Sequence, residues 1–187
     1  LIGVEMGLQK HIVRDARMFT EFNPFDFVIG STHVINGLDV SDSRFFEGKT
    51  KKEAYTEYFE NVLENAKLHD CYNLDYINRY SHYEDNSLEY KDYSDIIDEI
   101  LKVLVSKGKG LDINTSGYRY GLGRTNPQLD IVKRFKELGG EIVTVGSDAH
   151  KPEDVGAYFA EAYAMLKEAG FKYTASFRNK KATMVKL

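Results

Sequence analysis

The sequence has little cysteine and no long hydrophobic run. Its single cysteine, Cys71, cannot form a disulfide within the chain, which is typical of a reducing compartment. No apolar run approaches the roughly 20 residues of a membrane span, and no signal peptide is visible. The net charge is −4 and there is no block of Lys and Arg, so nucleic acid is not an expected partner. We therefore expect a cytoplasmic protein that acts without nucleic acid or membrane, with Cys71 as an inert, partly buried thiol.

The glycine-rich phosphate loops G-x-G-x-x-G and G-x-x-x-x-G-K-[ST] are also absent, which weakens the hypothesis of a nucleotide-binding fold. No linker or low-complexity stretch divides the chain, so we predict one domain over residues 1–187. A complete eight-unit β/α barrel usually needs about 250 residues. The chain is shorter, and Leu1 already lies in a strand-like apolar run with no initiator Met. We therefore expect the natural protein to extend further upstream.

Short apolar segments alternate with longer amphipathic ones, which is typical of parallel strands joined by helices. The strands that we expect are Leu1–Met6, Phe25–Val34, Leu74–Ile77, Gly110–Asn114 and Glu141–Ser147. The helices that we expect run from Thr50 to about Leu68, across Ile97–Val105, from Asn126 to Gly139 and from Pro152 to Ala169, before a β pair within Tyr173–Leu187. Both a doubly wound sheet and a β/α barrel fit this alternation.

Two helix starts carry recognisable end signals. Thr50 and Glu53 have the spacing of a capping box, in which each side chain accepts from the backbone N–H of the other residue. Asn126-Pro127 places a capping residue before a proline at the first helical position. We therefore expect both helices to begin at these residues.

Polar side chains follow each of the five expected strands. They are Glu5, Ser31-Thr32-His33, Asp75, Asn114-Thr115-Ser116 and Asp148-Ala149-His150. In β/α barrels the chemistry lies at the carboxyl ends of the strands, where these side chains would meet. Two histidines and two carboxylates suit Zn²⁺, Mn²⁺ or Fe²⁺, so we predict Glu5, His33, Asp148 and His150 as metal ligands.

The alternative is that each residue alone caps a helix or satisfies a loop. The convergence of four such residues favours a metal, which would lower the pKa of bound water toward neutrality. In the extended Asp148-Ala149-His150 segment, two ligands would point to one side. His11, His69 and His82 lie in helical or loop segments without neighbouring ligand residues, so we expect them at the surface.

Five segments carry a resemblance to the polymerase-and-histidinol-phosphatase (PHP) family. They are Gly3-Val4-Glu5, Ile29–His33, Leu74–Tyr80, Asp112–Arg119 and Gly146–His150. Within that family the sequence looks most like the monofunctional histidinol-phosphatases. The resemblance implies a distorted seven-stranded (β/α) barrel, here without its N-terminal strands, and a cluster of two or three metal ions.

The resemblance also implies roles for individual residues. Glu5 would bridge two metals, His33 would bind one of them, and Asp148 and His150 would complete the centre and take part in catalysis. Arg79 and Arg119 match positions that grip the substrate phosphate, and guanidinium groups pair bidentately with phosphate oxygens. The implied reaction is hydrolysis of L-histidinol phosphate to L-histidinol and phosphate.

The sequence departs from the family at two places. The His-x-His pair of the family's first strand would lie upstream of Leu1. The usual Gly-His-Leu-Asp reads Asn73-Leu74-Asp75, so that either Asn73 replaces a histidine ligand or a few residues are deleted before Leu74. We favour the deletion, because little chain separates the preceding helix from Leu74. The chain by itself should then bind metal poorly and be inactive.

Two other functions remain open. A related phosphoesterase could act on nucleotides or nucleic-acid ends, although the sequence shows no basic groove. An inactive member of the family could serve as a binding or structural subunit, and it would bind no metal tightly.

Overall fold

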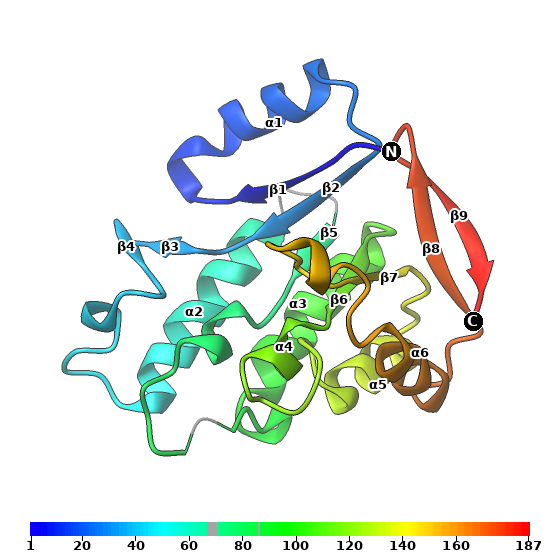
Figure 1. The fold of residues 1–187 in the computed structure, drawn as a ribbon. Helices are drawn as coiled ribbons and strands as arrows, with labels where there is room; N and C mark the ends of the chain where they lie inside the picture. The colour runs from blue at the N-terminus through cyan, green and yellow to red at the C-terminus, as the bar shows by residue number, and fades with distance from the viewer. Residues whose placement is uncertain (67–70, 86) are drawn as a thin grey trace.

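A computed structural model describes residues 1–66, 71–85 and 87–187, and the backbone alone for residues 71–73. Its main sheet has five parallel strands in the order β1-β2-β5-β6-β7 (Figure 1). They are β1 Gly3–Gly7, β2 Phe27–Ser31, β5 Cys71–Asn73, β6 Gly110–Asn114 and β7 Val143–Gly146. This order never reverses, as it would in a doubly wound sheet. The predicted α/β fold is therefore confirmed, whereas the seven-stranded barrel stays a prediction.

Helices connect the strands. They are α1 Val13–Phe22, α2 Lys51–Ala66, α3 Ser94–Ser106, α4 Ser116–Arg119, α5 Leu129–Glu137 and α6 Phe159–Glu168. Neighbouring pairs of α2, α3, α5 and α6 pack together, whereas α1 lies beside β1 and β2, apart from this row (Figure 1). The short 3₁₀ helices are η1 Lys10–Ile12, η2 Ser43–Phe45, η3 Tyr76–Arg79, η4 Tyr90–Asp92 and η5 Pro152–Asp154.

Two antiparallel pairs complete the fold: β3 Val34–Ile35 with β4 Leu38–Asp39, and β8 Tyr173–Arg178 with β9 Lys181–Lys186. The second pair confirms the β pair expected within Tyr173–Leu187. Helices α1 and α4 and the β3–β4 pair were not predicted from the sequence. Both α4 and the β3–β4 pair are too short to show a hydrophobic period.

Helix α2 begins at its predicted capping residues and buries one apolar face. Its capping box is confirmed, because the Thr50 N–H donates to Glu53 Oε2 (2.8 Å) and the Glu53 N–H donates to Thr50 Oγ1 (3.3 Å). One face of the helix is fully buried and includes Tyr58, Phe59 and Val62. Burying this face against the sheet and α3 supplies most of the stabilisation of the helix.

The strand expected at Leu74–Ile77 is wrong. Strand β5 ends at Asn73, which pairs with Ser31 of β2, and the chain then turns into η3 as the Asn78 N–H donates to the Asp75 carbonyl (3.1 Å). Leu74 and Ile77 are fully buried nevertheless. The apolar pattern reflected burial in a turn, which periodicity does not distinguish from a short strand.

Two predicted helix boundaries also need correction. Asn126 does not cap a helix, because its backbone pairs with Asn114 at the end of β6 and α5 begins only at Leu129. The helix expected from Pro152 to Ala169 is divided into η5 and α6. Tyr158, with φ of +60°, lies between them in the left-handed region that ends regular helices.

Gly110 of β6 lies where the sheet leaves no room for a side chain. A Cβ there would come within 2.6 Å of Ile142 Cγ2 and 2.8 Å of the Ile142 carbonyl oxygen. We expect Gly110→Ala to lower the free energy of unfolding by about 1–3 kcal/mol through overpacking. Urea denaturation followed by circular dichroism measures the effect. Gly3→Ala in β1 is the matched control, because its nearest contact would be 3.4 Å, and an equal loss in both variants would contradict the steric argument.

Candidate metal and phosphate site

The carboxyl ends of β1 and β2 bring Glu5 and His33 together. The two strands pair in register, and His33 Nε2 lies 3.4 Å from Glu5 Oε1 and 2.7 Å from Ser31 Oγ. The Tyr76 ring packs against the His33 imidazole with centroids 4.2 Å apart. A hydrogen bond from His33 holds the pKa of Glu5 below its ordinary value, against the opposing effect of burial. Glu5 is therefore a carboxylate at neutral pH, as a metal ligand must be.

Asp148 and His150 follow β7 and form the second pair. His150 Nδ1 lies 3.5 Å from Asp148 Oδ1 and 3.0 Å from the Asp148 carbonyl oxygen. The expected extended geometry is wrong, because Asp148 has φ of +51° in the left-handed region. Its side chain is only 16% exposed, whereas that of His150 is 77% exposed. The turn thus aims Asp148 inward and leaves His150 at the surface.

The four predicted ligands fit a divalent metal in chemistry but stand as two pairs. Carboxylate oxygens and imidazole nitrogens are the donors that Zn²⁺ and Mn²⁺ accept in proteins. Within residues 1–66, 71–85 and 87–187, no group of three or more His, Cys, Asp and Glu lies close enough together to hold a metal ion. A catalytic zinc site usually has three protein ligands, so each pair needs at least one more.

Asp75 follows the carboxyl end of β5 but is closed off from solvent. Its side chain is fully buried, and neither carboxylate oxygen has a hydrogen-bond partner in the described part of the chain. Burial raises its pKa to about 7, opposed by the charge of Arg124. Asp75 is therefore an interior acid rather than an accessible ligand.

The two predicted phosphate-binding arginines converge on the segment after β7. Arg79, the last residue of η3, donates from Nη1 to Asp148 Oδ2 (2.8 Å). Arg119, the last residue of α4, donates from Nη2 to the carbonyl oxygens of Ser147 (2.7 Å) and Asp148 (2.9 Å). Its Nε lies 3.6 Å from Asp154 Oδ2. Arg79 and Arg119, predicted from separate motifs, therefore both contact the predicted ligand Asp148.

Each arginine keeps a donor for which the described part of the chain offers no acceptor. Among the residues that the structure describes, Arg79 Nε and Arg119 Nη1 are buried without a hydrogen-bond partner. Unpaired buried donors of this kind are unusual in a folded protein and call for an explanation. An anion that accepts from guanidinium groups would supply one.

Sequence comparison identifies the family of the chain. The family model described as PHP domain matches residues 1–116. The probable histidinol-phosphatase of Clostridium acetobutylicum is 35% identical over 182 residues, which cover 92% of this chain and 69% of that protein. The chain belongs to the PHP family. The histidinol-phosphatase of Lactococcus lactis is likewise 35% identical, over 96% of this chain and 68% of its own length.

The fold of this PHP chain is also similar to that of a solved relative. The crystal structure of histidinol phosphate phosphatase from Lactococcus lactis, in complex with zinc, L-histidinol and phosphate, matches with a TM-score of 0.85 and 33% identity. The match covers 97% of this chain and 71% of that one. The PHP-type α/β fold is therefore established for the chain.

Several earlier expectations concern residues outside the site. His11 and His82 are exposed, as predicted. His69 and the side chains of Cys71 and Asn73 lie outside the described residues, so the predictions made for them are untested. In the portion of the chain that was described, no helix has the length and apolar character needed to cross a membrane.

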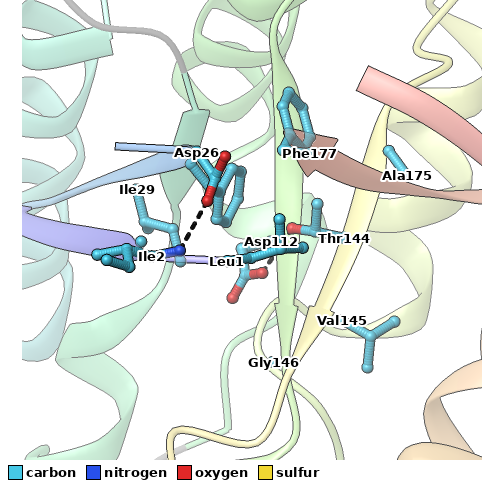
Figure 2. A pocket seen from close by; sticks show the side chains of 12 residues that line it. Leu1, Ile2, Asp26, Ile29, Asp112, Thr144, Val145, Gly146, Ala175 and Phe177 are labelled. Carbon is cyan, nitrogen blue, oxygen red and sulfur yellow. Dashed lines mark hydrogen bonds between the residues drawn. The ribbon is translucent and has the colours of Figure 1, made fainter. Parts of the chain in front are cut away.

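Asp112 is a buried acid that the sequence analysis did not single out. It lies in β6 and lines a pocket of about 360 Å³, where it accepts a hydrogen bond from Thr144 Oγ1 (2.6 Å; Figure 2). Much of the wall is apolar and includes Ile29, Val145 and Phe177. Burial raises the pKa of Asp112 to about 6, aided by the charges of Glu5 and Asp148. The sequence offered two signals for it. Asp112 is a charged residue at the centre of an apolar strand, and it begins the Asp112–Arg119 segment that resembles the PHP family.

The raised pKa of Asp112 predicts a pH-dependent loss of folding stability. As pH rises from about 4 to about 6, the unfolded state ionises first, so the folded state loses stability that Asp112→Asn would retain. We expect this variant to gain on the order of 1–3 kcal/mol over the natural protein at pH 7, and little near pH 3.5. Chemical denaturation across this pH range, with chelator present, measures the difference. The exposed Glu60→Gln is the control, and parallel curves for Asp112→Asn and the natural protein would refute the assignment.

Proposed function

We propose that this PHP protein is a metal-dependent phosphomonoester hydrolase whose substrate is L-histidinol phosphate. The observation that carries the proposal is the convergence of Arg79 and Arg119 on Ser147-Asp148, which includes the predicted metal ligand Asp148. A phosphate bound by the two guanidinium groups would thus lie beside the metal centre. The similarity to histidinol-phosphatases, including one solved with zinc, L-histidinol and phosphate, supports the choice of substrate.

The residues of the chain would share the chemistry as follows. Arg79 and Arg119 bind the phosphate oxygens and stabilise the negative charge that grows on them as water attacks phosphorus and the P–O bond to the alcohol breaks. Glu5, His33, Asp148 and His150 would hold the divalent metal, two or three ions of Zn, Mn or Fe. When bound, such a metal polarises phosphoryl oxygens and lowers the pKa of coordinated water.

We also propose that the five strands are part of a seven-stranded barrel. Residues of β1 and β7, the outer strands of the sheet, line the same pocket, so the sheet curls until its two edges face one another. Further strands between β1 and β7 would close the barrel and fill that pocket. The Clostridium relative is longer than its match to this chain, which supports additional elements in that protein.

The proposal predicts a metal-dependent phosphatase that needs both arginines. By the complete protein we mean the chain together with the upstream residues that the sequence leads us to expect. In it, we expect phosphate release from L-histidinol phosphate to require added Zn²⁺ or Mn²⁺ and to stop with chelator. Arg79→Ala and Arg119→Ala should each lower kcat/KM by about 10²–10³-fold, because each removes a preorganised positive charge. The exposed Arg44, which pairs with Asp42, gives the control Arg44→Ala, for which we expect unchanged turnover.

The 187-residue chain alone should bind metal weakly and turn over little substrate, since each ligand pair is incomplete. Full turnover by the isolated chain would contradict this part of the proposal. Faster release from nucleotides than from histidinol phosphate would favour the related phosphoesterase. Absence of tightly bound metal in the complete protein would favour an inactive family member. A preference for nucleotides and an absence of bound metal would each count against a histidinol-phosphatase.

A further inference from the structure

We propose that Tyr120 is a positioning residue that holds the Arg79 guanidinium in place for phosphate. The inference rests on the proposed function, because it assigns Arg79 to phosphate binding. The Arg79 Cζ atom lies 3.4 Å from the centroid of the Tyr120 ring, the distance of direct face-on contact. Cation–π attraction and flat packing both favour this arrangement for arginine.

Two contacts restrain the Arg79 guanidinium, one on its face and one along its edge. The Tyr120 ring covers one of its faces, and the hydrogen bond to Asp148 fixes the Nη1 edge within its plane. The Tyr80 ring is more distant, 5.5 Å from Cζ. In the described part of the chain, Asp148 is the only hydrogen-bond acceptor for Arg79, and one hydrogen bond by itself leaves the guanidinium plane free to rotate about it. Contact with the face of the Tyr120 ring prevents this rotation. The remaining N–H groups of Arg79 therefore point in one direction.

The backbone around Tyr120 gives the ring a defined place. Tyr120 follows Arg119 at the end of α4, where its N–H donates to the Ser116 carbonyl (3.0 Å). The turn is tightly packed, since a Cβ at Gly117 would lie 2.2 Å from the Arg124 carbonyl oxygen. Adjacent residues therefore act on both sides of the site, Arg119 through its own guanidinium and Tyr120 through that of Arg79.

The exposure of Tyr120 argues against a role in the core. The residue is 50% exposed, whereas the tyrosines of the core, such as Tyr55 and Tyr58, are fully buried. A half-exposed ring contributes less to stability than a buried one. Its closest described partner is the guanidinium that we assign to phosphate, which makes orientation of Arg79 its main effect.

The test compares Tyr120→Leu with Tyr120→Phe in the complete protein with Zn²⁺. Inorganic phosphate, a product of the proposed reaction, is the probe, and calorimetry measures its Kd. We expect Tyr120→Leu to weaken phosphate binding about three- to tenfold, as loss of a cation–π contact predicts, and Tyr120→Phe to retain it. Tyr173→Leu on β8, where the tyrosine is 45% exposed, is the matched control and should bind as the natural protein does.

Nuclear magnetic resonance of the arginine Nε–H groups separates positioning from folding. The ring current of residue 120 should shift the Arg79 signal in the natural protein and in Tyr120→Phe. In Tyr120→Leu this shift should be lost, while the backbone amide spectrum stays that of a folded protein. Unchanged phosphate affinity in a folded Tyr120→Leu would overturn the inference, as would an unchanged Arg79 signal. If the natural protein binds no phosphate, the proposed function fails, whereas the Arg79 signal still decides whether Tyr120 orders the guanidinium.

Discussion

The ion pair between Arg79 and Asp148 joins two segments that lie 69 residues apart and makes them one site. Both side chains are largely buried, with 9% and 16% exposure, so water screens their attraction only weakly. Removing either side chain would leave the charge of the other buried and unpaired, which would destabilise the folded state. The end of η3 and the turn after β7 are thereby held together, and Arg119 is tied to the same turn through two backbone carbonyls.

This arrangement gives Asp148 two duties. One carboxylate oxygen accepts from Arg79, while the other lies 3.5 Å from His150 Nδ1, its partner in the predicted metal site. A carboxylate shared between a guanidinium and a metal would couple the binding of phosphate to that of the metal. The left-handed backbone at Asp148 makes this possible, because it turns the side chain inward rather than along the strand. Strain of this kind is common where function depends on orientation.

Much of the architecture was predictable from the sequence because it follows from local patterns. The period of the apolar residues located β6, α2 and α3, and the Thr50–Glu53 spacing located the start of α2. Prediction failed at Leu74–Ile77, where buried apolar residues lie in a turn rather than in a strand. It also failed where pairing with a distant segment overrode a local helix signal. Asn126 pairs with Asn114 rather than capping a helix, and no local rule foresees that bridge.

The sequence by itself determined the residue types of the candidate site and the strand ends at which they lie, because parallel strands bring their carboxyl ends to one edge. It also determined the family, through motifs whose order is readable along the chain. Only the tertiary structure decided which of these side chains touch. The contact of Tyr120 with Arg79, the inward turn of Asp148 and the burial of Asp112 depend on backbone geometry and on neighbours distant in sequence, and neither is encoded in any local pattern.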